Sequence, residues 1–270
     1  MQIKKTFQPL VIFKKSFLQW QRNALAVISI YSLTILSAYA LKFYSFISRE
    51  LYIHTGEWAA SAFSTAMYAA VFFLNSFITL VVAHYFLRGD KKRVSFDIAF
   101  QGARETITPY FKALLFYLSI MFLLGGLGLF FFIAGRAHFG PQAAGGVNMP
   151  ALLTTSTATV VLWIAFFWYG FFFSLAPLIS VFENTGMAAA LSASKSLIKK
   201  CPWRYLAVFL IFLGLYFFVG VILYTIAAAF SGGKYILLGW IDPVMMVLWA
   251  PLWIGLWVYS YQGLRAVAEN

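Results

Sequence analysis

Six long apolar runs are the feature that most constrains the fold of this chain. Each is about 18 residues or longer, enough for one α-helix to cross the roughly 30 Å of hydrocarbon in a bilayer. The expected spanning helices are about Ala24–Ser45, Ala62–Leu87, Phe111–Ala134, Thr155–Val181, Tyr205–Phe230 and Pro243–Tyr261. Strands of a membrane barrel would instead alternate apolar and polar residues over about 10 positions. The continuous runs therefore predict an all-α integral membrane protein with six transmembrane helices.

The composition excludes a soluble globular protein. Of the residues, 62% are hydrophobic and only 10% are charged, whereas soluble domains carry about 25% charged residues. The net charge of +12 would suggest a nucleic-acid partner in a soluble protein. Here the Lys and Arg residues gather between apolar runs, which is typical of loops held near anionic headgroups. The predicted partners are membrane lipids and other membrane proteins, with no nucleic acid.

The distribution of basic residues predicts the orientation in the membrane. Sixteen of the twenty Lys and Arg residues fall in the N-terminal segment, the second-to-third connection, the fourth-to-fifth connection and the C-terminus. The other side keeps Lys42, Arg49, Arg136 and Lys234. Positively charged loops stay in the cytoplasm. We therefore expect both termini to be cytoplasmic, in a bacterial-type inner membrane, which agrees with an even number of spans.

One pattern occurs three times along the chain. A short basic amphipathic stretch runs directly into an apolar run at Leu10–Trp20, Phe96–Ile107 and Met187–Cys201. This predicts a single membrane domain, 1–270, built from three parallel repeats of an amphipathic interfacial helix and two spans, at about 8–90, 91–182 and 183–265. Pro109 and Pro202 lie where the second and third amphipathic helices should bend into the following spans.

Each amphipathic stretch has its apolar residues on one helix face. In the first, Leu10, Phe13, Phe17 and Trp20 follow spacings of three and four, which place them on the same side. Such a helix lies in the headgroup plane with its apolar side toward the hydrocarbon. It can be an ordinary connector, or it can dock anionic lipid or a partner. For the docking alternative the predicted lipid contacts are Lys195, Lys199, Lys200 and Arg204.

Few polar groups lie in or beside the predicted spans. Asn75 is deep in the second span, His84 is near its cytoplasmic end, and Glu183 follows the fourth. Pro177 and Pro251 each interrupt the second span of a repeat, where broken helices can mark a transport site. These five residues are the candidates for a polar pathway or hinge. The alternative is structural: an interhelical hydrogen bond for Asn75 and a favourable charge near a helix N-terminus for Glu183.

No motif for nucleophilic or metal-dependent catalysis occurs in the sequence. Cys201 is the single cysteine, and no cluster of His, Cys or acidic residues has metal-ligand spacing. We therefore predict a non-enzymatic protein with no cofactor, no metal and no catalytic residue. A lipid-modifying enzyme stays an alternative, and it would need His84, Glu183 and Lys195 to meet near the headgroups.

The segment Phe171–Phe212 resembles bacterial six-helix inner-membrane proteins of the YciC-like family. It is also similar to the membrane domain fused to some glycerophosphodiester phosphodiesterases. The matching features, in order, are Pro177, Glu183, Ala188–Ala190, Ser194, Ser196 and Lys199. Pro251–Arg265 is similar to the last span of that family. The phosphodiesterase domain has no counterpart here, because its barrel needs about 250 residues. The resemblance thus implies a membrane module without that activity.

Together these patterns favour a protein that organises lipids or partner proteins in envelope homeostasis. A transporter or channel for a small or amphipathic solute is the main alternative. It would need a polar cavity lined by Asn75, His84 and the kinks at Pro177 and Pro251.

Overall fold

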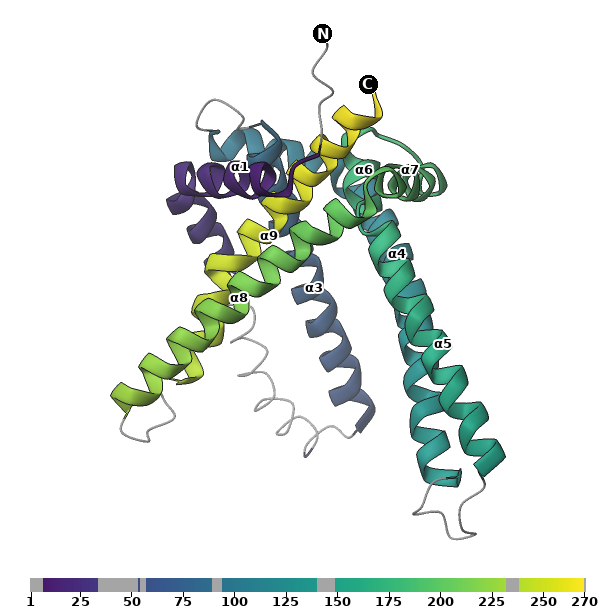
Figure 1. Cartoon of the computed structure of the whole chain (residues 1–270). Helices are drawn as coiled ribbons and strands as arrows, with labels where there is room; N and C mark the ends of the chain where they lie inside the picture. The colour runs from purple at the N-terminus through teal and green to yellow at the C-terminus, as the bar shows by residue number, and fades with distance from the viewer. Residues whose placement is uncertain are drawn as a thin grey trace. The chain divides into compact units, whose positions relative to one another are not determined.

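Helices form every regular element that the computed structural model describes, which covers residues 7–33, 53, 57–88, 94–139, 149–231 and 238–269, and no strand occurs among these residues (Figure 1). Apart from a short apolar helix at Ala24–Leu33, the helices are α1 Pro9–Arg22, α3 Glu57–Arg88, α4 Phe96–Phe139, α5 Met149–Phe173, α6 Ala176–Phe182, α7 Met187–Lys200, α8 Pro202–Ser231 and α9 Leu238–Ala268. The predicted all-α class is confirmed.

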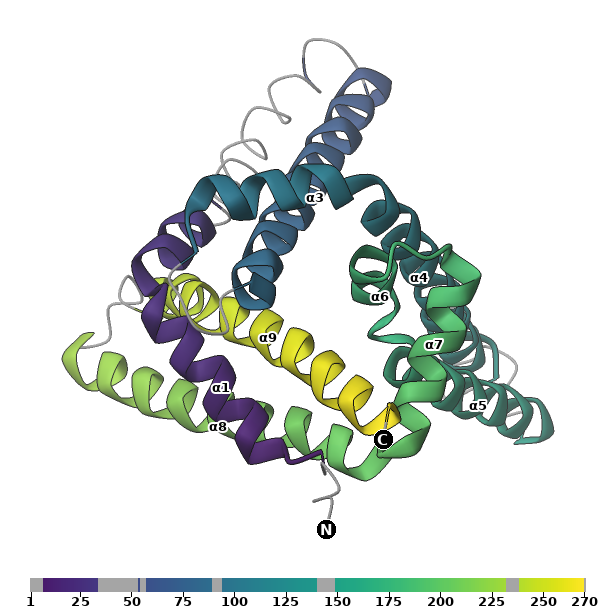
Figure 2. The same cartoon turned by 90° about the horizontal axis from the view of Figure 1, so that it is seen from above.

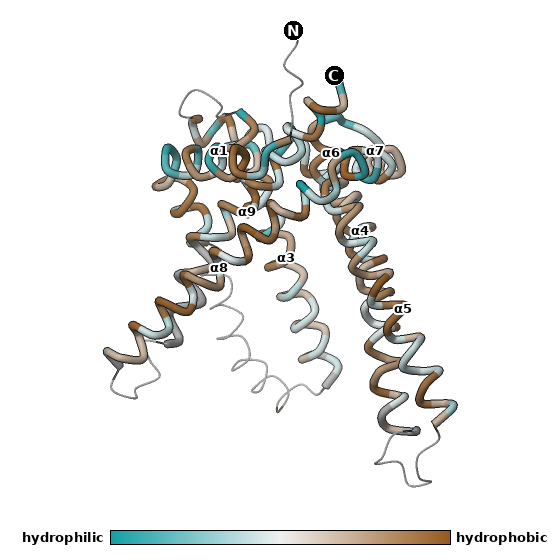
Figure 3. Tube along the Cα trace, viewed as in Figure 1, coloured by the Kyte–Doolittle hydropathy of each residue, from teal (hydrophilic) through white to brown (hydrophobic). Residues whose placement is uncertain are grey.

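Four of the described helical segments are long and apolar enough to cross a membrane. They are Ala60–Arg88, Phe96–Gly135, Met149–Phe182 and Pro202–Ala229. Only 6% of the most apolar window of Phe96–Gly135 is buried within the protein, so its side chains need lipid around them rather than water. The chain is therefore a membrane protein with transmembrane helices. Figure 3 shows apolar residues along α4, α5 and α8, and mixed polarity on α1 and α7.

These four segments overlap the second to fifth predicted spans. The first predicted span is described only at its start, where Ala24–Leu33 forms a short apolar helix, and its remaining residues lie outside the described ones. The sixth, Pro243–Tyr261, falls within α9, which is helical throughout but is not one of the four.

Two compact units make up the chain: Met1–Ile107 with Cys201–Asn270, and Thr108–Lys200. The three predicted repeats divide the chain differently and stay a prediction. In the first unit, α9 packs against α1, α3 and α8, and Figure 2 shows α1, α8 and α9 side by side. The ring of Trp253 in α9 packs edge-on against Phe209 and at a tilt against Phe212 of α8, with ring centroids 4.9 and 4.7 Å apart.

In the second unit, the part of α4 from Thr108 onward lies antiparallel to α5 (Figure 1). Small residues allow close approach: Gly128 faces Trp163, and Gly135 faces Thr155. Helices α6 and α7 pack together at the C-terminal end of α5, so they lie at one end of the apolar pair.

The prolines end or interrupt helices at only some of the predicted positions. α7 ends at Lys200 and α8 begins at Pro202, and α5 ends at Phe173 shortly before Pro177 in α6. By contrast, α4 stays helical through Pro109 and α9 through Pro251. A helix boundary therefore lies at the predicted bend at Pro202, and another lies just before Pro177, whereas none lies at Pro109 or Pro251. The hinge role of Pro177 and Pro251 stays a prediction.

Candidate functional site

Helix α7 has one packed side and one basic side. Ala190, Ser194, Leu197 and Ile198 are buried, and they hold α7 on α5 and α6. Lys199 and Lys200 are exposed in the last turn, where cations interact favourably with the negative end of the helix dipole. The apolar hairpin thus carries a basic helix across one of its ends (Figures 1 and 3).

Lys195 is fixed on the same helix by an aromatic ring. Its Nζ lies 5.1 Å from the centroid of the Trp168 ring in α5, within the range of a cation–π contact. Trp168 is 46% exposed, so the ammonium group is held at the outer edge of the α5–α7 contact. Three of the predicted lipid contacts therefore share one surface, which we call the α7 basic surface: Lys195, Lys199 and Lys200.

Arg204, the fourth predicted lipid contact, belongs to the other compact unit. It lies in the first turn of α8, and its Nη1 donates a hydrogen bond to the carbonyl oxygen of Phe7 at 3.3 Å. Its side chain is exposed, but this hydrogen bond connects α8 to the segment that precedes α1.

The interruption between α5 and α6 is stabilised by hydroxyl groups. Beyond Phe173 the chain turns through Ser174 and Leu175, and Pro177 has no N–H to continue the ladder. The last carbonyls of a helix lack helical partners. Here three hydroxyls donate to them: Tyr117 Oη to Gly170 at 3.2 Å, Ser174 Oγ to Phe171 at 3.0 Å, and Ser194 Oγ to Phe172 at 2.9 Å.

Two further groups complete this junction within the second unit. Ser180 Oγ lies 2.8 Å from the Pro177 carbonyl and 3.4 Å from that of Pro109. Tyr169 stacks on Tyr117 with centroids 5.7 Å apart, and its buried Oη has no hydrogen-bond partner in the described part of the chain. In apolar surroundings, interrupted backbone is tolerated where neighbouring groups satisfy its carbonyls, and at this junction hydroxyl groups do so.

His84 takes part in a packed helix contact. It is buried, its Nε2 lies 3.0 Å from Thr106 Oγ1, and Gly102 leaves the space that its ring fills. Asn75, on the same helix, is half-buried, and its carbonyl accepts a hydrogen bond from Thr79 Oγ1 at 2.9 Å.

The remaining predicted pathway residues are not gathered around the described cavity. Pro177 and Glu183 lie in and just after α6 in the second unit, and Pro251 is buried in α9 of the first. The groove between α1 and α9 is lined by none of the five predicted pathway residues. His84 contacts Thr106, whereas Lys195 contacts Trp168, so these two side chains serve separate helix contacts.

Among the described residues, no group of three His, Cys, Asp or Glu side chains comes close enough together to bind a metal ion. No family model, curated protein or solved structure matches the chain. The candidate site consists of the α7 basic surface and the hydroxyl-stabilised junction that α7 packs against.

Sequence reasoning missed the hydroxyls of Tyr117 and Ser194 and the ring of Trp168. Ser and Tyr are abundant in membrane helices, so composition does not single these residues out. The one local signal was Pro177, which marks where carbonyls lose their donors.

Proposed function

We propose that this protein is a non-enzymatic multi-pass protein of the inner membrane that organises anionic lipids, or partner proteins, through basic amphipathic helices at the cytoplasmic face. The observation that carries the proposal is the α7 basic surface, on a helix packed across one end of an apolar pair. A cationic helix in that position meets anionic headgroups.

The first amphipathic helix supports the same role. The described α1 packs through Ile12, Ser16 and Gln19, all buried, whereas Leu10 is 71% and Phe17 39% exposed. Two members of the apolar stripe, Leu10 and Phe17, therefore face away from the protein, whereas Phe13 and Trp20 are half-buried. An apolar stripe left uncovered beside exposed lysines fits a helix lying in the lipid interface.

The proposed topology has six spans with both termini in the cytoplasm, and Cys201 provides a test. This single cysteine is partly exposed between α7 and α8, on the side that carries most of the basic residues. We expect a membrane-impermeant maleimide to label it in inside-out vesicles but not in right-side-out vesicles. In a Cys201→Ser background, Met149→Cys should give the opposite pattern, because it precedes a span on the other side. Labelling of Cys201 only from the outside would contradict the topology.

Anionic lipid binding tests the function directly. We expect Lys195→Ala/Lys199→Ala/Lys200→Ala to weaken binding of anionic phospholipid by about 100-fold, because each interfacial lysine contributes about 1 kcal/mol and every 1.4 kcal/mol is tenfold. Native mass spectrometry of the purified protein with co-purified or added lipid measures the retained species.

Charge and not side-chain length should matter in that experiment. The matched variant with arginine at the same three positions should retain anionic lipid, and Ser192→Ala/Ser196→Ala on the same helix should leave binding unchanged. Lipid retention that is equal in the alanine and arginine variants would refute the lipid-organising role of α7.

A transporter or channel is the second candidate, favoured by the interruption within the candidate span Met149–Phe182. Discontinuous helices build substrate sites in many transporters. Solute or ion flux through proteoliposomes that changes with Pro177→Ala, while lipid retention stays the same, would favour this function over the first.

A further inference from the structure

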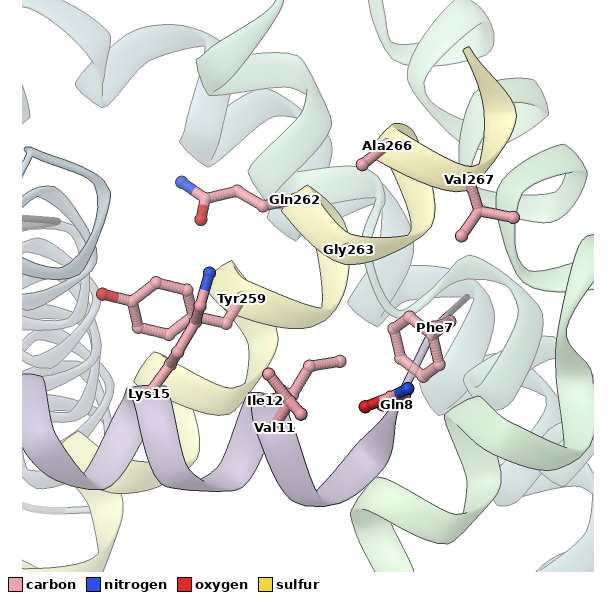
Figure 4. A pocket seen from close by; sticks show the side chains of 10 residues that line it. All are labelled: Phe7, Gln8, Val11, Ile12, Lys15, Tyr259, Gln262, Gly263, Ala266 and Val267. Carbon is pink, nitrogen blue, oxygen red and sulfur yellow. The ribbon is translucent and has the colours of Figure 1, made fainter. Parts of the chain in front are cut away.

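A groove of about 350 Å³ lies between α1 and the C-terminal part of α9 in the first unit (Figure 4). Its floor is apolar and is formed by Phe7, Ile12 and Tyr259, which are all buried. Pockets for small ligands begin at about 300 Å³ and are typically lined by apolar side chains with a few polar groups. This groove has that composition, and none of its lining residues belongs to the α7 basic surface.

Gly263 shapes the groove. A Cβ atom at this position would lie 3.1 Å from the Phe7 ring, which is tighter than ordinary van der Waals contact, and 3.4 Å from Ile12. The absent side chain lets Phe7 and Ile12 pack down onto α9. The space above them stays open.

The rim of the groove is positively charged. Lys15 is the one charged side chain among the described lining residues, and it is exposed. Gln262 adds an amide group, and Gln8 adds another at the end of the groove next to Phe7 (Figure 4). Figure 4 shows Lys15 reaching across the groove toward Tyr259 and Gln262. α1 also begins here without a side-chain cap and without an acidic residue in its first turn. The groove is therefore complementary to a negatively charged group attached to an apolar body.

The groove lies away from the lipid-facing stripe of α1. Each residue turns a helix by about 100°, so Lys15 is on nearly the opposite side of α1 from Phe17, which is exposed on the apolar stripe. An apolar ligand in the groove is consequently separated from the lipid that covers that stripe.

We infer that this groove binds one single-chain anionic amphiphile, a free fatty acid, with its carboxylate at Lys15 and its chain along Phe7, Ile12 and Gly263. The volume suits one acyl chain, not the two chains of a phospholipid. One ammonium group, with the Gln262 amide on the same side of the groove, matches the single charge of a carboxylate. This ligand is independent of lipid binding by α7.

Photo-labelling tests the inference with the full chain in nanodiscs of zwitterionic lipid. The probe is a long-chain fatty acid carrying a diazirine on its chain, and peptide mass spectrometry maps the adducts. We expect adducts on the groove segments of α1 and α9, reduced by about tenfold or more in Lys15→Gln, because that change removes the charge-assisted hydrogen bond between the ammonium group and the carboxylate. Lys14→Gln is the matched control, since Lys14 is equally exposed but does not line the groove.

Each remaining arm of the experiment decides one part of the inference. Lys15→Arg should keep the labelling because it keeps the positive charge. A diazirine alcohol of equal chain length should label the groove weakly because it has no carboxylate. Gly263→Leu should abolish labelling because its side chain occupies the groove. The Lys195→Ala/Lys199→Ala/Lys200→Ala variant should label the groove normally, which separates this site from the proposed function. Equal adducts in Lys15→Gln and Lys14→Gln, adducts spread along α8, or stronger competition by a lysophosphatidate than by the fatty acid would overturn the assignment.

Discussion

Gly255→Ala is expected to destabilise the first unit by about 3 kcal/mol, at the upper end of the cost of overpacking a core. A Cβ atom at Gly255 in α9 would lie 2.5 Å from Cε1 and 2.8 Å from two further ring atoms of Phe86. Phe86 is 1% exposed and packs edge-to-face on Tyr259, with centroids 6.2 Å apart. Neither the ring nor the α9 backbone can move without opening the α3–α9 contact. Thermal unfolding in a fixed detergent, followed by Trp fluorescence, measures the loss.

Two companion variants identify the cause of that loss. Gly214→Ala in α8 places its Cβ where nothing lies within 4 Å, so the higher helix propensity of Ala should raise stability by about 0.5–1 kcal/mol. Adding Phe86→Leu to Gly255→Ala should restore part of the lost stability by removing the ring edge. If the two glycine variants unfold at the same temperature, the close α3–α9 packing described here is wrong.

The helical class was predictable because it depends on local patterns. Continuous apolar runs predicted the long apolar helices. The spacing of apolar residues by three and four predicted α1 and α7, with ends within about two residues of the observed Pro9–Arg22 and Met187–Lys200. These signals need no knowledge of distant contacts. The face of α1 that packs was not predictable in the same way. Ser16 and Gln19 are buried although they are polar, because in a membrane the apolar stripe can face lipid.

The candidate site was only partly predictable, since its parts come together over long sequence separations. The lysines of the α7 basic surface followed from charge, but Trp168 lies 27 positions before Lys195 along the chain. The α1–α9 groove joins Phe7 to Gly263, residues at opposite ends of the sequence. The two prolines gave the same sequence signal but lie in different local structures. Pro177 follows the end of α5, whereas Pro251 lies inside a continuous helix. A proline removes one hydrogen bond, and the surrounding packing decides whether the helix ends.

The double variant Tyr117→Phe/Ser194→Ala should destabilise the second unit by about 2–6 kcal/mol, because each change removes a donor from a carbonyl in apolar surroundings at about 1–3 kcal/mol. The Tyr117 hydroxyl of α4 donates a hydrogen bond to the Gly170 carbonyl. The hydroxyl of the fully buried Ser194 in α7 donates one to the Phe172 carbonyl. Both hydrogen bonds are part-buried, so each change leaves a carbonyl that is partly shielded from solvent without this donor. Hydrogen exchange across residues 170–182 should accelerate, and the thermal unfolding temperature should fall.

The chain supplies a matched control for this junction. Ser119→Ala/Ser196→Ala removes hydroxyls from the same two helices, but these donate at 2.7 and 2.9 Å to carbonyls within their own helices, at exposed positions. That variant should stay within about 0.5 kcal/mol of the unmodified protein, as is usual for surface substitutions. Equal stability of the two double variants would show that the α5–α6 interruption does not depend on Tyr117 and Ser194. A loss confined to the first double variant would show that hydroxyl donors from α4 and α7 stabilise the interruption between α5 and α6.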